Sequence, residues 1–211
     1  MADYSVLSNF GVRYFLADVA DVFSSGVLKS SVLLTAGEEI TDVLSCDVGE
    51  ISKEVKTFKT LNGDGWDSAV PLGQSVSEGN MSLIRTGTGQ YSSSGTTSYD
   101  RLRAWMESAA AAGGATAAKA LVEVVPRGQD VNSGTGATGT HTIFDATAYI
   151  VTPTRFNPGE RNTSDGQEYS ISFQPYGKPQ TQKAWDSLAD GTKLTGAGVY
   201  LNSTIPTTQP S

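Results

Sequence analysis

The side chains that could carry out chemistry in this chain are few and widely spaced. His141 is the only histidine and Cys46 the only cysteine. A Ser-His-Asp or Cys-His site would have to use His141, yet Cys46 is far away in the sequence and no nucleophile-elbow pattern is present. We therefore expect His141 to be a solvated loop histidine. A zinc site needs several histidine or cysteine ligands, and one of each does not suffice.

Two glycine-containing segments have part of a ligand-binding pattern. Residues 62–67 place oxygen ligands at alternating positions, but an EF-hand loop would need a further ligand at Trp66 and a distal glutamate. A hairpin turn with solvated carboxylates is favoured there over calcium. Residues 113–119 lack the Gly-Lys-Ser/Thr triplet of a phosphate loop and are followed by a strand pattern. No two carboxylates stand out as acid and base, so the sequence predicts no enzyme, no metal and no cofactor.

Composition narrows the class of protein further. The 211 residues carry a net charge of −7, which argues against a protein that binds nucleic acid by neutralising phosphates, but not against one that DNA passes without sticking. A single cysteine excludes an intramolecular disulfide. We see no signal peptide at residues 1–5 and no apolar run of about 18 residues, so we expect a protein folded in the cytoplasm, with no membrane partner.

One helix is predicted, near residues 98–112. Thr97 and Asp100 have the spacing of a capping box, and Gly113 can end the helix. Apolar residues recur at a helical period on one face, which we expect to pack on a sheet. The core residues of this helix are Tyr99, Leu102, Trp105 and Met106.

Nearly all other patterned segments favour strands. They cover residues 11–22, 27–34, 40–48, 51–61, 79–85, 119–125, 143–151 and 168–174. The strand at 119–125 is expected to end at Pro126, and Pro153 to mark an edge or a bulge. Within the last strand Tyr169, Ile171 and Phe173 should face inward. Residues 66–77 read as a loop and 181–188 as a short helix.

These segments predict a mainly β (α+β) fold of two packed antiparallel sheets, a β-sandwich or barrel, with one flanking α-helix. We expect a single domain over residues 1–188. From residue 189 on the periodicity is lost, so residues 189–211 are expected to form a flexible C-terminal arm that orders, if at all, on a neighbouring subunit.

The order of these parts resembles that of a known family over about residues 45–180. The matching segments are DVGEIS at 47–52, KTFKTL at 56–61, GDGW at 63–66, VPLGQS at 70–75, the strand at 79–85, the helix, VVPRG at 124–128, ATAYIV at 146–151 and EYSISFQPYG at 168–177. Together they resemble the major tail tube proteins of tailed bacteriophages. No single motif is diagnostic, because the likeness lies in the sequence of parts.

The resemblance implies a structural subunit of the virion tail that is assembled in the host cytoplasm. Six subunits would form a ring, rings would stack into a tube, and the lumen would conduct genomic DNA during ejection without specific binding. The implied partners are other copies of the chain, a tape-measure protein, a tail terminator and baseplate or tail-tip proteins. We expect the inner wall to be net negative or neutral, because an acidic wall would repel DNA and let it slide.

The resemblance also implies that a long loop after the strand at 51–61 stacks one ring on the next. Trp66 is a large apolar side chain in this otherwise polar segment, and aromatic anchors often dominate interfaces. The predicted inter-ring stacking loop consists of Asn62, Gly63, Asp64, Gly65, Trp66, Asp67 and Pro71. Alternatively, Trp66 folds back into the core of its own domain.

Two other functions fit the same segments. An inner-tube subunit of a bacterial contractile injection system would have nearly the same sequence pattern. A non-catalytic β-sandwich tail adhesin would need exposed aromatic residues clustered in its loops, and the long loops hold only Trp66 and Tyr91.

Overall fold

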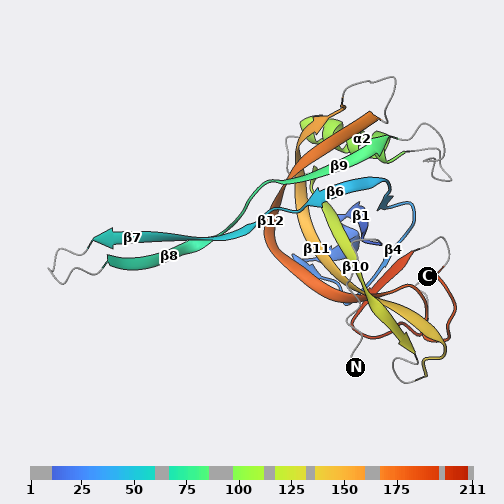
Figure 1. The fold of residues 1–211 in the computed structure, drawn as a ribbon. Helices are drawn as coiled ribbons and strands as arrows, with labels where there is room; N and C mark the ends of the chain where they lie inside the picture. The colour runs from blue at the N-terminus through green and yellow to red at the C-terminus, as the bar shows by residue number, and fades with distance from the viewer. Residues whose placement is uncertain are drawn as a thin grey trace, which may run out of the picture.

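A computed structural model describes residues 11–59, 67–85, 97–111, 117–131, 136–159, 167–194 and 198–208. Its body is a curled antiparallel sheet with one long helix lying against it, and a two-stranded ribbon projects from one side (Figure 1). None of the helices in these ranges is both long enough and apolar enough to span a bilayer. The predicted mainly β fold with one flanking helix is confirmed.

Nine strands build the main sheet. They are β1 (Arg13–Asp18), β4 (Ser31–Leu34), β5 (Glu39–Ile40), β6 (Val43–Asp47), β9 (Gly79–Arg85), β10 (Lys119–Val131), β11 (Thr140–Asn157), β12 (Gln167–Trp185) and β13 (Val199–Asn202). The remaining elements are α1 (Val19–Val22), β2 (Phe23–Ser24), β3 (Val27–Leu28), β7 (Ile51–Lys59), β8 (Asp67–Val76) and α2 (Ser98–Ala111).

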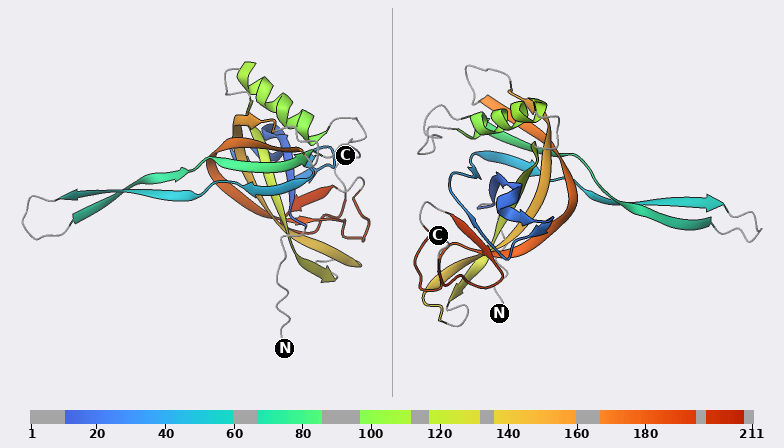
Figure 2. Two further views of the ribbon diagram at one scale, coloured as in Figure 1. Left: turned by 45° about the horizontal axis from the view of Figure 1, so that its top comes forward. Right: turned by 180° about the vertical axis from the view of Figure 1, so that it is seen from behind.

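The long strand β12 is the branch point of the sheet. It pairs with β11 from Ser170 to Trp185 and with β9 from Gln167 to Phe173, and its last two residues pair with β13. Beyond these neighbours lie β6 on one branch and β4 on the other. The two layers expected from the sequence are therefore joined by hydrogen bonds through β12, and the sheet curls around between them (Figure 2).

Hydrophobic residues fill both faces of this sheet. On β1, Phe15 and Ala17 join one core cluster, while Tyr14 and Leu16 join the other, as the two-residue period of a strand requires. The buried residues of strand β10 alternate between the two clusters in the same way. The predicted inward residues of β12, which are Tyr169, Ile171 and Phe173, are buried in the second cluster.

Helix α2 covers the second cluster. The Asp100 amide donates to Thr97 Oγ1 at 3.1 Å, and the Thr97 hydroxyl donates to Asp100 Oδ2 at 2.7 Å, which starts the helix where the sequence predicted. Of the four helix residues that the sequence assigned to the core, Tyr99, Leu102 and Trp105 are buried and Met106 is half-buried.

Arg101 fixes the helix to the edge of the sheet. Its guanidinium donates to the carbonyl oxygens of Glu39 at 2.9 Å and of Leu16 at 3.3 Å. Burial lowers the pKa of Arg101 from its ordinary value, with a nearby carboxylate, Glu38, acting in the opposite direction. The helix is therefore held by hydrogen bonds to backbone as well as by apolar packing.

Several predicted element ends were wrong, because strands continue through prolines. Strand β10 runs past Pro126 to Val131 with a register shift between Pro126 and Gly128, and β11 runs past Pro153 with a shift before Arg155. A bulge accommodates a residue that cannot donate to the ladder. The helix expected at 181–188 is wrong too, since β12 extends to Trp185.

The segment beyond residue 188 differs from the expected flexible arm. Strand β13 lies between β12 and β4 inside the sheet, and Val199 and Leu201 are fully buried. The Ala189 amide donates to the Pro206 carbonyl at 2.7 Å. This apolar strand is covered by its own chain, which a composition-based view of the segment could not detect.

Candidate assembly interface

The most prominent surface feature is the hairpin of β7 and β8. Its strands pair only with each other, from Ile51 opposite Val76 to Lys59 opposite Asp67. Figure 1 and Figure 2 show this ribbon extending away from the body. An isolated two-stranded hairpin is marginally stable in water, so a partner surface would stabilise it.

The neck of the hairpin is held by a short network of hydrogen bonds. The Ser77 amide donates to the Glu50 carbonyl at 3.0 Å, and the Glu50 amide donates to the Ser77 hydroxyl at 2.8 Å. Gly49 has φ +88° and lies against the Ser77 carbonyl. This close approach and the left-handed backbone both require glycine. The direction of the hairpin is thus set by backbone contacts at residues 49–50 and 77.

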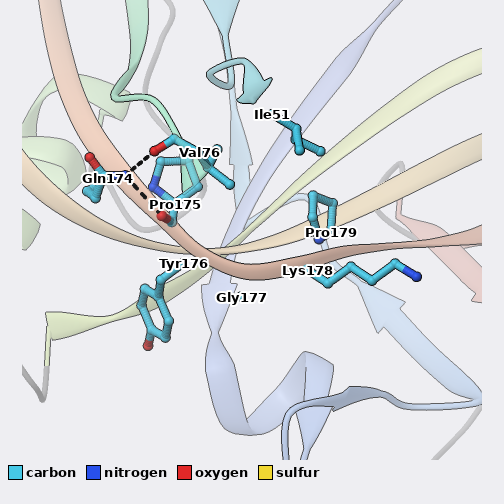
Figure 3. A pocket seen from close by; sticks show the side chains of 8 residues that line it. All are labelled: Ile51, Val76, Gln174, Pro175, Tyr176, Gly177, Lys178 and Pro179. Carbon is cyan, nitrogen blue, oxygen red and sulfur yellow. Dashed lines mark hydrogen bonds between the residues drawn. The ribbon is translucent and has the colours of Figure 1, made fainter. Parts of the chain in front are cut away.

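A groove of about 530 Å³ opens where the hairpin meets β12. Figure 3 shows Ile51 and Val76 from the hairpin base on one side, with Pro175 and Pro179 of β12 facing them. Gln174 joins the two parts, since its Nε2 donates to the Val76 carbonyl at 2.8 Å and to the Pro175 carbonyl at 3.1 Å. The groove is completed by Tyr176, Gly177 and Lys178.

The bend of β12 creates this groove. Gly177 has φ +76°, and the register against β11 shifts between Ala148 and Ile150. Two of the four exposed large hydrophobic residues of the described chain lie here, Ile51 at 52% and Tyr176 at 49% exposure. An apolar groove with half-exposed Ile and Tyr side chains has the composition of a protein contact surface rather than of a reaction site.

The predicted stacking loop is placed only in part. Asn62, Gly63, Asp64, Gly65 and Trp66 lie outside the described residues. Asp67 and Pro71 are in strand β8, opposite Lys59 and Val55, so residues 67–76 form a strand where the sequence predicted a loop. The register shift between Glu54 and Val55 lies opposite the segment with Pro71, which explains how β8 tolerates a proline.

His141 is buried, and the prediction of a solvated loop residue was wrong. It lies on β11 and is fully buried, with Nδ1 2.8 Å from the Ser187 hydroxyl. Ser187 is itself buried and donates to Asp186 Oδ1 at 3.1 Å. Although a histidine, a serine and an aspartate meet here, the serine and the imidazole are enclosed, so a substrate cannot reach them. The alternation of β11 gave no signal for this burial, because the buried Phe144, Ala146 and Ala148 are an odd number of residues away from His141.

Cys46 is half-buried on β6. Burial, followed by the nearby Glu123 carboxylate, raises the pKa of its thiol to about 12, so the thiol stays protonated at neutral pH. Within the described ranges, no three His, Cys, Asp or Glu side chains lie close enough together to hold a metal ion.

The groove residues were not identified from the sequence. The alternation in EYSISFQPYG predicts a strand with an inward face, but it says nothing of where that strand bends or of what approaches it. The Pro-Tyr-Gly at the end of this segment was the available signal, because Pro and Gly interrupt a regular ladder.

Comparison with known proteins gives a likeness at the level of structure alone. No family model and no curated protein sequence matches the chain. A chain in the sheath–tube complex of the extracellular contractile injection system PVC, in the extended state, matches with a TM-score of 0.51 at 12% identity, over 86% of this chain and 93% of that one.

Two terminal assemblies of such systems hold similar chains. One is in the PVC sheath/tube terminator, with a TM-score of 0.52 at 11% identity, over 86% of this chain and 99% of the other. The second is in the tube-terminating cap of the anti-feeding prophage, with a TM-score of 0.52 at 10% identity, over 86% and 94%. The chain therefore has the fold of proteins in the tube assemblies of contractile injection systems, and the predicted tail-tube-like fold is confirmed.

Proposed function

We propose that the chain is a structural subunit of a tail tube, built from hexameric rings that stack around a lumen through which DNA passes. The fold is that of proteins in tube assemblies. The order of sequence segments over about residues 45–180 resembles that of tail tube proteins. The observation that carries the proposal is the β7–β8 hairpin, which extends from the body and forms its own two-stranded sheet.

The hairpin would contact a neighbouring copy in the stack. Asn62, Gly63, Asp64, Gly65 and Trp66 belong to the connection between β7 and β8, and Asp67 and Pro71 follow on β8. A ribbon that reaches away from its own sheet can cross the boundary between rings, and a contact between unlike surfaces repeats around a ring and along a stack. The groove at its base, with the exposed Ile51 and Tyr176, is a second apolar surface for the same assembly.

The other components of such a tail follow from this role. A tape-measure protein would fill the lumen before ejection, and a terminator and baseplate or tail-tip proteins would bind the two ends of the tube. The chain's net charge of −7 supports a lumen that repels DNA rather than binding it.

An inner-tube subunit of a bacterial contractile injection system is the second candidate. The structural likenesses to chains from the PVC and anti-feeding prophage assemblies favour it specifically. The two candidates share one subunit fold and one assembly mechanism, and they differ in whether a genome passes through the tube. A non-catalytic adhesin would not need the hairpin to join copies together.

A shortened hairpin tests the assembly role. Residues 54–73 are replaced with Asn-Gly, which turns the chain between the register partners Lys53 and Gln74. Sedimentation velocity and negative-stain electron microscopy then compare this variant with the wild type. We expect rings or tubes from the wild type and folded, unassembled protein from the variant. Tubes of normal abundance from the variant would contradict the role of the hairpin.

A further inference from the structure

A second opening, of about 390 Å³, lies beside strand β6 and shares no lining residue with the hairpin groove. Its polar lining residues are Tyr14, Ser45, Cys46 and Glu123, and its apolar ones are Val12, Val43, Leu44 and Val125. Leu44 of β6 is 52% exposed. The opening lies on the same face of β10 as the second core cluster, which α2 covers, because Glu123 and Leu121 are two residues apart on that strand.

Glu123 gives this cleft its charge. It lies directly opposite Tyr14 in the pairing of β10 with β1. The Tyr14 hydroxyl donates a hydrogen bond to Glu123 Oε1 at 3.2 Å. Among the described residues, no lysine or arginine forms an ion pair with Glu123. A half-buried carboxylate with one oxygen bound to a phenol is therefore left without a cation.

The negative charge of Glu123 contributes to the raised pKa values of three neighbouring side chains. After burial, the Glu123 carboxylate is the next cause that raises the pKa of Tyr149 to about 12. It is also the next cause after burial that raises the pKa of Cys46, and it raises the pKa of Tyr14 after burial and the Cys46 thiol. Phenols and a thiol that stay protonated can donate or accept hydrogen bonds but cannot balance the charge of the carboxylate. A cationic group could therefore enter the cleft beside the neutral phenols and thiol and pair with the Glu123 carboxylate.

Strand β7 carries a concentration of the required charge. In nine residues it has Lys53, Lys56 and Lys59 against the single acid Glu54, in a chain whose net charge is −7. This strand extends away from the acidic body on the projecting hairpin (Figure 2). A basic strand on an extension and an acidic cleft on the body are complementary surfaces at different places on one subunit. Such a pair joins copies head to tail.

We propose that the Glu123 cleft binds a lysine ammonium group from β7 of a second copy of this chain. The inference rests on the proposed function, because it names the surface that receives the hairpin. Glu123 is the counter-ion, and the cleft walls exclude water from the pair.

Charge reversal tests the pairing. Glu123→Gln keeps the shape and the acceptor for Tyr14 but removes the charge, and it should raise the concentration for half-maximal assembly about tenfold or more. Glu123→Lys should abolish assembly, and one of Lys53→Glu, Lys56→Glu or Lys59→Glu should restore it in the double variant. Glu107→Gln, which removes an exposed carboxylate of α2 outside the cleft, is the matched control and should assemble. Melting temperatures check that every variant is folded.

A carbodiimide cross-link separates this inference from the proposed function. The reagent joins a carboxylate directly to an amine in contact with it, and mass spectrometry of concentrated wild-type protein should find Glu123 joined to a β7 lysine of another molecule. If this product forms in dimers or small oligomers without any rings or tubes, the cleft pairing stands and the tube proposal fails. Tubes that form without the product, or an unchanged assembly of Glu123→Gln, would overturn the cleft pairing alone.

Discussion

The carbonyl oxygen of Ser77 lies so close to Gly49 that it would overlap a Cβ atom placed on that residue. These two residues are on either side of the hairpin, just before β7 and just after β8, so they form its neck. No side chain fits between them. This close approach of the two backbones, together with the hydrogen bonds between Glu50 and Ser77, holds the neck of the hairpin.

Gly49→Ala is expected to displace the hairpin and impair assembly. The new methyl group must move the Ser77 backbone, and alanine is strained at φ +88°. Gly26→Ala is the matched control, because Gly26 also has positive φ (+77°) but has nothing within 4 Å of the added Cβ. Sedimentation velocity should show loss of assembly for the first variant only. Equal assembly of both variants would show that the neck contact does not orient the hairpin.

Leu102→Ala should destabilise the subunit by about 2–5 kcal/mol, because Leu102 is 2% exposed and its truncation leaves a cavity beneath α2. Chemical denaturation of the purified protein measures the change. Arg103→Ala on the outer face of the same helix is the control and should unfold close to the wild type, since its ion pair with Glu107 is exposed. A wild-type midpoint for Leu102→Ala would mean that α2 does not pack on the sheet in solution.

The C-terminal segment should exchange its amide protons slowly at Val199–Asn202. This strand is hydrogen-bonded to β4 and its first three residues are buried, so its amides open only with the sheet. Hydrogen exchange followed by mass spectrometry on unassembled protein checks this. Exchange as fast as in an unstructured peptide would restore the flexible arm that the sequence predicted.

Cys46 should react slowly with iodoacetamide. Its pKa is raised from an ordinary value of 9.0 to about 12, which leaves roughly a thousandfold less thiolate at pH 8. Labelling of the native protein is compared with labelling in guanidinium, and Cys46 is the only thiol to be modified. Equal rates in the two states would contradict the burial of this thiol.

The same shift makes stability depend on alkaline pH. The folded state holds the Cys46 proton more tightly than the unfolded state, so the contribution to the free energy of unfolding is complete below pH 9 and is lost as the pH rises toward about 12. The pKa of Tyr14 is also raised, mainly by burial, and acts in the same direction. Denaturation midpoints should fall over this range, and the fall should be smaller in Cys46→Ala.

Local sequence patterns correctly predicted the elements whose ends or buried faces depend on their own residues. Strand β9 was predicted with its observed bounds, Gly79–Arg85, and α2 begins at the Thr97 cap that the sequence indicated. The inward faces of β11 at residues 144–148 and of β12 at residues 169–173 also follow from alternation, because buried residues recur there at every second position.

Sequence patterns gave wrong predictions where the local structure depends on contacts with segments that are far away in the sequence. Ala184, Trp185 and Leu188 have a spacing that suggests a helix. However, Ala184 and Trp185 pair with Phe144 and Ile143 of β11 and with β13 on the other side. Proline residues at bulges hid the continuation of β8, β10 and β11. The groove beside Ile51 was not predictable either, because it depends on the bend of β12 at Gly177 and on the approach of the hairpin neck.

Cryo-electron microscopy of the purified wild-type protein tests self-assembly most directly. Concentrated protein should form hollow rings or tubes of repeating subunits, with the β7–β8 hairpin of each copy resting on a neighbour and the inner wall negative or neutral in charge. Monomers with a free hairpin at every concentration would contradict the tube function. A tube lined by a continuous stripe of lysine and arginine would contradict the proposed passage of DNA without binding.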